Sequence, residues 1–106
     1  MRITIAHTRT KAEIIQAIDR SFADAFKNPP AGLPVQISVE QQSWAGSILT
    51  FALKAKMGFV STPIKGTVEV TDHDVTIDAD LGMLGRFISE EKAKDLLGAR
   101  VKKLLN

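Results

Sequence analysis

The chain has 106 residues, 44% hydrophobic and 25% charged, which is typical of one globular domain spanning residues 1–106 rather than of a disordered segment. It has no cysteine, which excludes disulfides, thiol nucleophiles and thiolate zinc sites, and its net charge of +2 is too small to indicate nucleic-acid binding. The N-terminal residues lack the apolar core of a signal peptide, and no apolar run is long enough to span a bilayer. A cytoplasmic location without a transmembrane segment is therefore expected.

The N-terminal part of the sequence predicts a strand followed by a helix. Residues 2–7 are expected to form the strand, because Ile3 and Ile5 alternate with polar residues. Thr10 and Glu13 have the spacing of a capping box, which predicts that a helix begins at residue 11. A pair of prolines ends this helix near residue 27. The predicted helix 11–27 carries one apolar stripe, made of Ile14, Ile15, Ile18, Phe22, Ala25 and Phe26.

From residue 35 the apolar residues recur with a period of two. This pattern predicts four strands at 35–41, 47–56, 65–71 and 74–81, with a tight turn at Ala45-Gly46. Each strand has one apolar and one polar face, which is typical of an antiparallel sheet covered on one side only. On the polar face, Lys54 and Lys56 are expected to lie beside acids of neighbouring strands. The candidate acids are Glu40, Glu69, Asp78 and Asp80.

A final helix is expected over residues 90–105, with Ser89 as its N-cap. Its inner stripe is Ala93, Leu97, Val101 and Leu104, and Gly98 indicates close packing against another element. The expected fold class is therefore α+β, an antiparallel sheet of four to five strands covered on one face by two helices, in the order β-α-β-β-β-β-α. The expected core is Leu49, Phe51, Leu53, Val68, Val70, Val75 and Ile77 with Ile18, Phe22, Leu97 and Val101.

The residues that could carry chemistry form no recognisable catalytic arrangement. The chain has two histidines, and neither has a nucleophile or a base near it in the sequence. His7, at the end of the first strand, is expected to bond to backbone, with a ligand contact as the alternative. The acids around His73 lack the spacing of a calcium loop, and no glycine-rich phosphate loop is found. We therefore expect no catalytic residue, no metal and no cofactor, and a protein that is not an enzyme.

Two apolar segments give the strongest functional signal, since loops in solvent rarely hold so many large apolar residues. One, expected as a loop between strands, contributes Met57, Phe59, Val60 and Ile64, and the other, before the last helix, contributes Met83, Leu84, Phe87 and Ile88. Three interpretations stay open: the segments fold back onto the core, they join two copies in a homodimer, or they bind an apolar ligand or surface. Trp44 is expected to anchor the core or the sheet edge, with a binding role as the alternative.

Three motifs resemble the polyhydroxyalkanoic acid system protein family, whose members are small bacterial proteins of about this length. They are Trp44-x-Gly46-x-x-Leu49-x-Phe51, then Gly66-x-Val68-x-Val70-x-Asp72-x-x-Val75-x-Ile77, then Leu81-x-x-Leu84. The resemblance covers nearly the whole chain. It implies a link to polyhydroxyalkanoate granules, the storage polyester of the cell, and it transfers no catalytic residue. The order of elements is also similar to half of a helix-grip, lipid-binding fold, which is an analogy of fold alone.

The leading hypothesis is a non-enzymatic binding or accessory protein linked to polyhydroxyalkanoate granules or metabolism. It would act through apolar surface, either on the granule itself or on a granule protein. The alternative is a small ligand-binding domain that holds an acyl or other lipid-like molecule in a pocket between the sheet and the helices.

Overall fold

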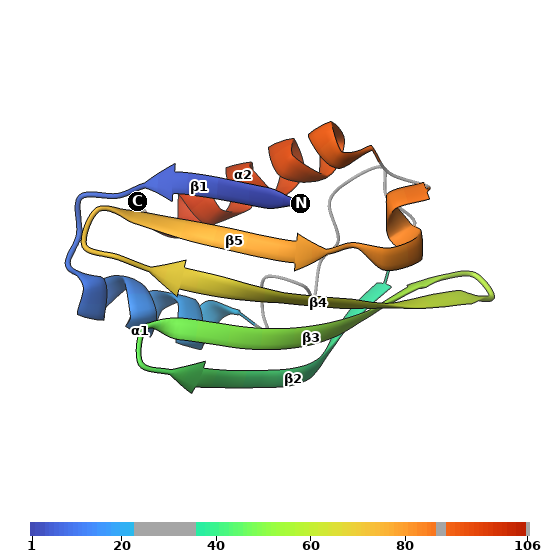
Figure 1. The fold of residues 1–106 in the computed structure, drawn as a ribbon, viewed down its shortest axis with the longest axis horizontal. Helices are drawn as coiled ribbons and strands as arrows, with labels where there is room; N and C mark the ends of the chain where they lie inside the picture. The colour runs from blue at the N-terminus through green and yellow to red at the C-terminus, as the bar shows by residue number, and fades with distance from the viewer. Residues whose placement is uncertain (23–35, 87–88, 106) are drawn as a thin grey trace.

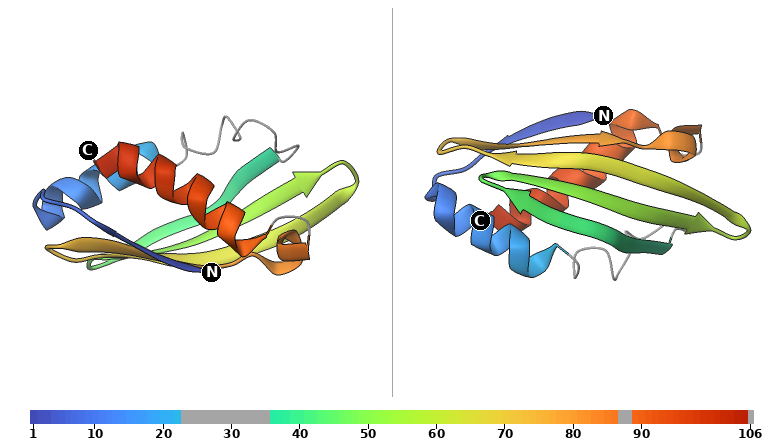
Figure 2. Two further views of the ribbon diagram at one scale, coloured as in Figure 1. Left: turned by 90° about the horizontal axis from the view of Figure 1, so that it is seen from above. Right: turned by 60° about the horizontal axis from the view of Figure 1, so that its bottom comes forward.

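A five-stranded antiparallel sheet forms the centre of the fold, and two α-helices lie on one of its faces (Figures 1 and 2). A computed structural model of the chain describes residues 1–22, 36–86 and 89–105. The elements are β1 (Arg2–Ala6), α1 (Lys11–Ser21), β2 (Gln36–Ala45), β3 (Ile48–Met57), β4 (Val60–Val70), β5 (Asp74–Asp80), the short 3-10 helix η2 (Gly82–Arg86) and α2 (Glu90–Leu105). The strands lie in the order β1-β5-β4-β3-β2. The predicted fold class and element order are confirmed.

Both α-helices begin at the predicted caps. The Thr10 hydroxyl accepts a hydrogen bond from the Glu13 backbone N–H at 3.2 Å and donates one to the Glu13 carboxylate at 3.0 Å. The Ser89 hydroxyl accepts from the Lys92 backbone N–H at 3.2 Å. These bonds satisfy N–H groups that have no partner within the helix. The described part of α1 ends at Ser21, and residues 23–27 of the predicted helix, with Ala25 and Phe26, lie outside the described residues.

Strand β2 runs past its predicted end at residue 41. Its register against β3 shifts by one residue between Val39 and Gln41, which places a β-bulge at Glu40. Inward-facing positions therefore have odd numbers before the bulge and even numbers after it, as at Trp44. The alternation looks broken in the sequence although the strand continues, which explains why the predicted strand was too short.

The largest correction concerns residues 57–64, which were predicted to form a loop between strands. A two-residue turn, Gly58-Phe59, joins β3 directly to β4, and β4 begins at Val60 instead of near residue 65. Gly58 has a φ of +59°, and a positive φ at the first turn position is what the tight hairpin turn requires. The apolar segment is thus the end of a β-hairpin.

Pro63 lies within this strand without disrupting the sheet. Met57 and Val60 form the hydrogen-bonded pair next to the turn, and the pairs alternate, so Pro63 and Lys54 form a non-hydrogen-bonded pair. The nitrogen of Pro63 consequently points away from β3, towards the side on which β5 has already ended. No ladder hydrogen bond is lost there, because β4 pairs with β5 only from Lys65 onwards.

The core lies between the sheet and the helices and follows the prediction for the strands and α1. The predicted residues that are buried are Leu49, Phe51, Leu53, Val68, Val70, Val75, Ile77, Ile18 and Phe22. Leu97 and Val101 of α2, which were expected to be buried with them, are only partly buried, whereas Leu105 is buried. The reason is the position of α2, which packs on the edge strand β1 and on α1, so that part of its inner stripe stays accessible.

Two glycines allow close contacts in this layer. Gly66 of β4 lies opposite Phe51 of β3, and a Cβ atom at Gly66 would come within 2.7 Å of the Phe51 ring. Gly98 of α2 packs against β1, where a Cβ atom would lie 3.0 Å from Cδ1 of Ile3. The close packing predicted for Gly98 is therefore confirmed.

The other face of the sheet is polar, but its charges are arranged differently from the prediction. Lys54 and Lys56 have only uncharged residues directly opposite them. These residues are Ser38 and Pro63 for Lys54, and Gln36 and Ser61 for Lys56. The acids with a base directly opposite belong to β5, and the pairs are Asp78 with Arg2 and Asp80 with Lys65. The register, which the sequence pattern does not determine, decides these pairs.

Candidate functional site

The end of the β3–β4 hairpin, which we call the hairpin tip (Met57–Val60), combines exposure with apolar character. Among the described residues, three large hydrophobic side chains are exposed, and two of them, Phe59 and Val60, are neighbours at the tip. Phe59 has a relative exposure of 106%, and Val60 of 37%. Ile48, the third, stands at the opposite end of β3. Of the three interpretations left open, folding back onto the core is thereby excluded for Phe59 and Val60.

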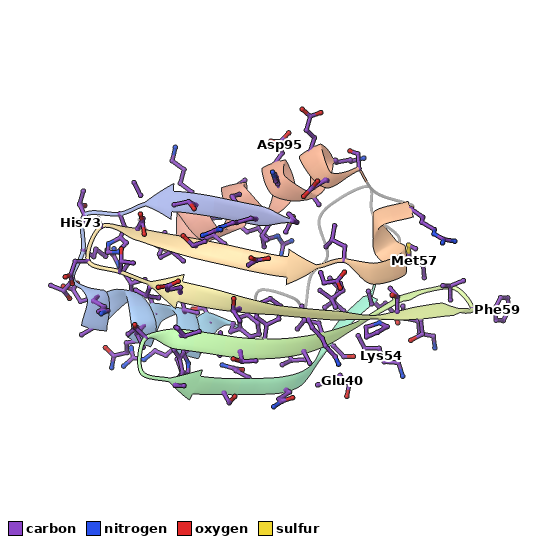
Figure 3. The ribbon with its side chains drawn as sticks, in the orientation of Figure 1. Glu40, Lys54, Met57, Phe59, His73 and Asp95 are labelled. Carbon is purple, nitrogen blue, oxygen red and sulfur yellow. The ribbon has the colours of Figure 1, made fainter. Side chains whose placement is uncertain are left out.

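The hairpin tip extends beyond the neighbouring elements. β5 ends opposite Lys65, so the first residues of β4 are paired with β3 alone. Figures 1 and 2 show the hairpin reaching past the ends of β2, η2 and α2 along the long axis of the molecule. Phe59 occupies the extreme end in Figure 3. This position lets the tip meet a flat surface before the rest of the sheet does.

The two faces of the hairpin differ in character. Met57 and Val60 are paired with each other and share the face of the buried residues, which the helices cover further along the sheet. Lys54 and Lys56 lie on the opposite face, and both are exposed. The tip therefore has an apolar end and a basic flank, and the two lysines are residues that the sequence-based site prediction missed. Their signal was present as the alternation of lysine and apolar residues that leads into Met57.

The remaining predicted apolar site residues are Ile64, Met83, Leu84, Phe87 and Ile88. Ile64 is only 5% exposed and belongs to the core, because it faces the helices across from Leu53. Met83 and Leu84 fall in η2, which packs against β4, and their side chains are not among those described. Phe87 and Ile88 lie outside the described residues.

His7 is held within the fold. Its ring Nε2 lies 2.8 Å from the backbone carbonyl oxygen of Thr71, and its backbone N–H donates to the carbonyl of His73 at 2.9 Å. A carbonyl only accepts, so Nε2 must carry the proton in this contact. Nδ1 is buried and has no hydrogen-bond partner. The predicted backbone bond is confirmed, and it joins the end of β1 to the turn between β4 and β5.

Trp44 links the sheet edge to a helix. Its indole N–H donates to the Asp19 carboxylate of α1 at 3.0 Å, and the Gln42 side chain donates to the same oxygen at 3.3 Å. Trp44 is partly buried and packs against the core. These contacts match its predicted role as an anchor between the core and the edge strand β2.

No cluster of three His, Asp or Glu side chains able to hold a metal ion occurs among residues 1–22, 36–86 and 89–105. In the same part of the chain, no helix has the length and apolar character needed to cross a membrane.

Comparison with known proteins adds no relative. No family model matches the chain, and no significant match is found among curated proteins or solved structures. The resemblance to the polyhydroxyalkanoic acid system family accordingly stays a prediction.

Proposed function

We propose that this is a non-enzymatic binding protein that uses its hairpin tip to contact an apolar surface, and that the surface belongs to a polyhydroxyalkanoate granule or to a protein on it. The observation that carries the proposal is the fully exposed Phe59 at the end of a projecting hairpin. The choice of a granule as the surface rests on the resemblance to the polyhydroxyalkanoic acid system family. A cytoplasmic location is part of the same proposal.

Phe59 is fully exposed at the second position of the hairpin turn. The turn requires a positive φ at its first position, which Gly58 provides. The second position, where Phe59 stands, is commonly filled by small polar residues in other hairpins. Transfer of one large apolar side chain out of water contributes about 1.5–3 kcal/mol. Association itself costs at least about 4 kcal/mol, so Phe59 and Val60 with the half-buried Met57 support a weak, reversible contact. Such a weak contact suits a protein of which many copies bind to one large surface.

The non-catalytic part of the proposal is supported by the state of the histidines. The His7 ring is buried and already bonded to the Thr71 carbonyl, so it is not positioned to take a proton from a substrate. His73 lies in the β4–β5 turn, at the opposite end of the molecule from Phe59 (Figure 3). Neither histidine therefore serves the hairpin tip.

A lipid-like ligand between sheet and helices is the weaker proposal. The side chains that face the helices pack on one another there, with the rings of Phe22 and Phe51 5.3 Å apart between their centroids. A homodimer through the tip is the other alternative, because two tips could cover each other.

The proposal is tested by co-sedimentation of the full chain with purified polyhydroxyalkanoate granules and with protein-free polyester particles. Phe59→Ser should weaken binding by about 10- to 100-fold, the range that corresponds to the burial of one large side chain. Ile48→Ser, which removes the exposed side chain at the other end of β3, is the matched control and should bind like the wild type. Binding unaffected by Phe59→Ser would refute the role of the tip. Analytical ultracentrifugation of the same variants measures dimerisation.

A further inference from the structure

The basic flank of the hairpin indicates what kind of apolar surface the tip meets. Lys54 and Lys56 follow one another on the same exposed face of β3, directly before the tip. Neither has a charged residue directly opposite on β2 or β4. The acid nearest in the register is Glu40, in the bulge of β2 beyond Ser38. The two ammonium groups thus carry charge that no directly facing carboxylate balances.

The spacing of these lysines suits an interfacial position. Two residues, Met57 and Gly58, separate Lys56 from Phe59, and because the chain turns at Gly58-Phe59, the two lie less than about 10 Å apart along the hairpin. Elements that bind at the lipid interface bury their apolar side by about 5–10 Å, into the boundary between headgroups and acyl chains. With Phe59 inserted to this depth, Lys56 lies at the level of the headgroups, and its flexible stem lets the ammonium group reach a phosphate.

The other charges near the tip do not reverse this pattern. Lys65 on β4 lies opposite Asp80, whose carboxylate also accepts a hydrogen bond from the Gly82 backbone N–H at 3.0 Å. Arg86, at the end of η2, is exposed. The exposed Glu90 and Glu91 belong to the first turn of α2, which the hairpin outreaches (Figure 2). The lysines, and not these acids, are the charged groups adjacent to Phe59.

The two exposed lysines also count against two other binding partners for the tip, a bare polyester surface and a second copy of the chain. A bare polyester surface is uncharged and offers the lysines no partner. In a symmetric contact between two copies, the tips would bring the Lys54 and Lys56 pairs of both chains close together, and like charges disfavour such a contact. An anionic phospholipid layer offers both acyl chains for Phe59 and phosphates for the lysines.

We propose that the hairpin tip binds an anionic phospholipid layer, with Phe59 inserted among the acyl chains and Lys54 and Lys56 on the headgroup phosphates. The inference rests on the proposed apolar contact of the tip and specifies its chemistry. Each lysine near an anionic membrane surface is worth about 1 kcal/mol, which is about a fivefold change in binding. Both lysines together should therefore change binding by roughly 10- to 30-fold.

The test is co-sedimentation of the full chain with phosphatidylcholine vesicles and with vesicles that also contain phosphatidylglycerol. The wild type should bind the mixed vesicles more tightly, and added salt should weaken this binding. Lys54→Gln/Lys56→Gln should lose roughly 10- to 30-fold in affinity for the mixed vesicles. Lys92→Gln/Lys103→Gln, which removes two exposed lysines of α2, is the matched control and should leave the affinity unchanged. Circular dichroism confirms that each variant is folded.

Insertion is measured separately with the variant Trp44→Phe/Phe59→Trp, whose only tryptophan lies at the tip. Its emission should shift to the blue with the mixed vesicles, and lipids brominated on the acyl chains should quench it. Equal binding to neutral and anionic vesicles, or binding that the lysine variant retains, would overturn the inference. So would an absence of vesicle binding while Phe59-dependent binding to polyester particles persists, and in that case the proposed function would stand.

Discussion

Phe51→Ala should produce the largest loss of stability among single substitutions in the sheet. Phe51 is only 5% exposed, and its ring packs at 51° against the ring of Phe22 of α1. Loss of a buried phenylalanine side chain costs about 3–5 kcal/mol, and the value rises when neighbours cannot fill the space. Gly66, opposite Phe51, has no side chain, and Ala79 beyond it has only a methyl group. We therefore expect a loss of about 4–5 kcal/mol.

The contact with Gly66 makes the reasoning testable in a double-mutant cycle. A Cβ atom at Gly66 would come closest to the backbone carbonyl oxygen of Asp78 and would lie 2.7 Å from the Phe51 ring. Gly66→Ala alone should cost about 1–3 kcal/mol as an overpacked site. In the Phe51→Ala background the contact of the new methyl group with the ring is relieved, whereas its contact with the Asp78 carbonyl oxygen remains. The double mutant should then lose less stability than the two single losses added together, with a coupling of about 0.5–3 kcal/mol.

The assay is urea denaturation, followed by circular dichroism and by the fluorescence of Trp44. Domains of this kind have total stabilities of about 5–15 kcal/mol, so Phe51→Leu supplies a milder variant if Phe51→Ala does not fold. Thr50→Ala, on the exposed face of the same strand, is the control and should change stability by less than about 0.5 kcal/mol. Additive losses, or a loss below about 1 kcal/mol for Phe51→Ala, would show that the ring does not pack over Gly66.

Three smaller effects follow from single hydrogen bonds. Trp44→Phe removes the indole donor to Asp19 and should cost about 1 kcal/mol in urea denaturation, whereas Asp19→Asn keeps an acceptor and should cost less. Thr10→Ala removes the α1 cap and should cost about 0.5–2 kcal/mol, whereas Thr10→Ser keeps the capping hydroxyl and should retain most of the stability. His7→Ala deprives the Thr71 carbonyl of its donor and should cost about 1–3 kcal/mol. Nitrogen NMR of the wild type should find a proton on Nε2 of His7, and a ring protonated on Nδ1 alone would contradict this bond.

The elements that local sequence signals specify agree with the prediction. The Thr10–Glu13 box and Ser89 mark helix starts through bonds that span three residues, so the information is contained in the segment itself. Strands β3 and β5 show uninterrupted alternation, and their buried residues follow from it. These features depend on period and capping, which act over a few residues.

The candidate site was only partly visible in the sequence. The apolar residues from Met57 to Val60 stood out by composition, but their role as a loop was wrong, because the alternation on both sides of Gly58 closes into a hairpin. Ile64 belongs to the same apolar segment but is buried, because its position in the register turns its side chain towards the helices. The basic flank emerged only with the pairing, which sets Lys54 and Lys56 opposite uncharged residues.

The sequence by itself determined the order of the helices and strands and which face of most strands is apolar, because side-chain alternation and capping are local. Only the tertiary structure decided which chain positions meet. The bulge at Glu40 shifts the face of β2, the edge position of α2 leaves Leu97 partly exposed, and His7 reaches Thr71 from 64 positions away. Such contacts depend on register and on packing between distant segments, and a one-residue slip in register turns a side chain from the core to the solvent.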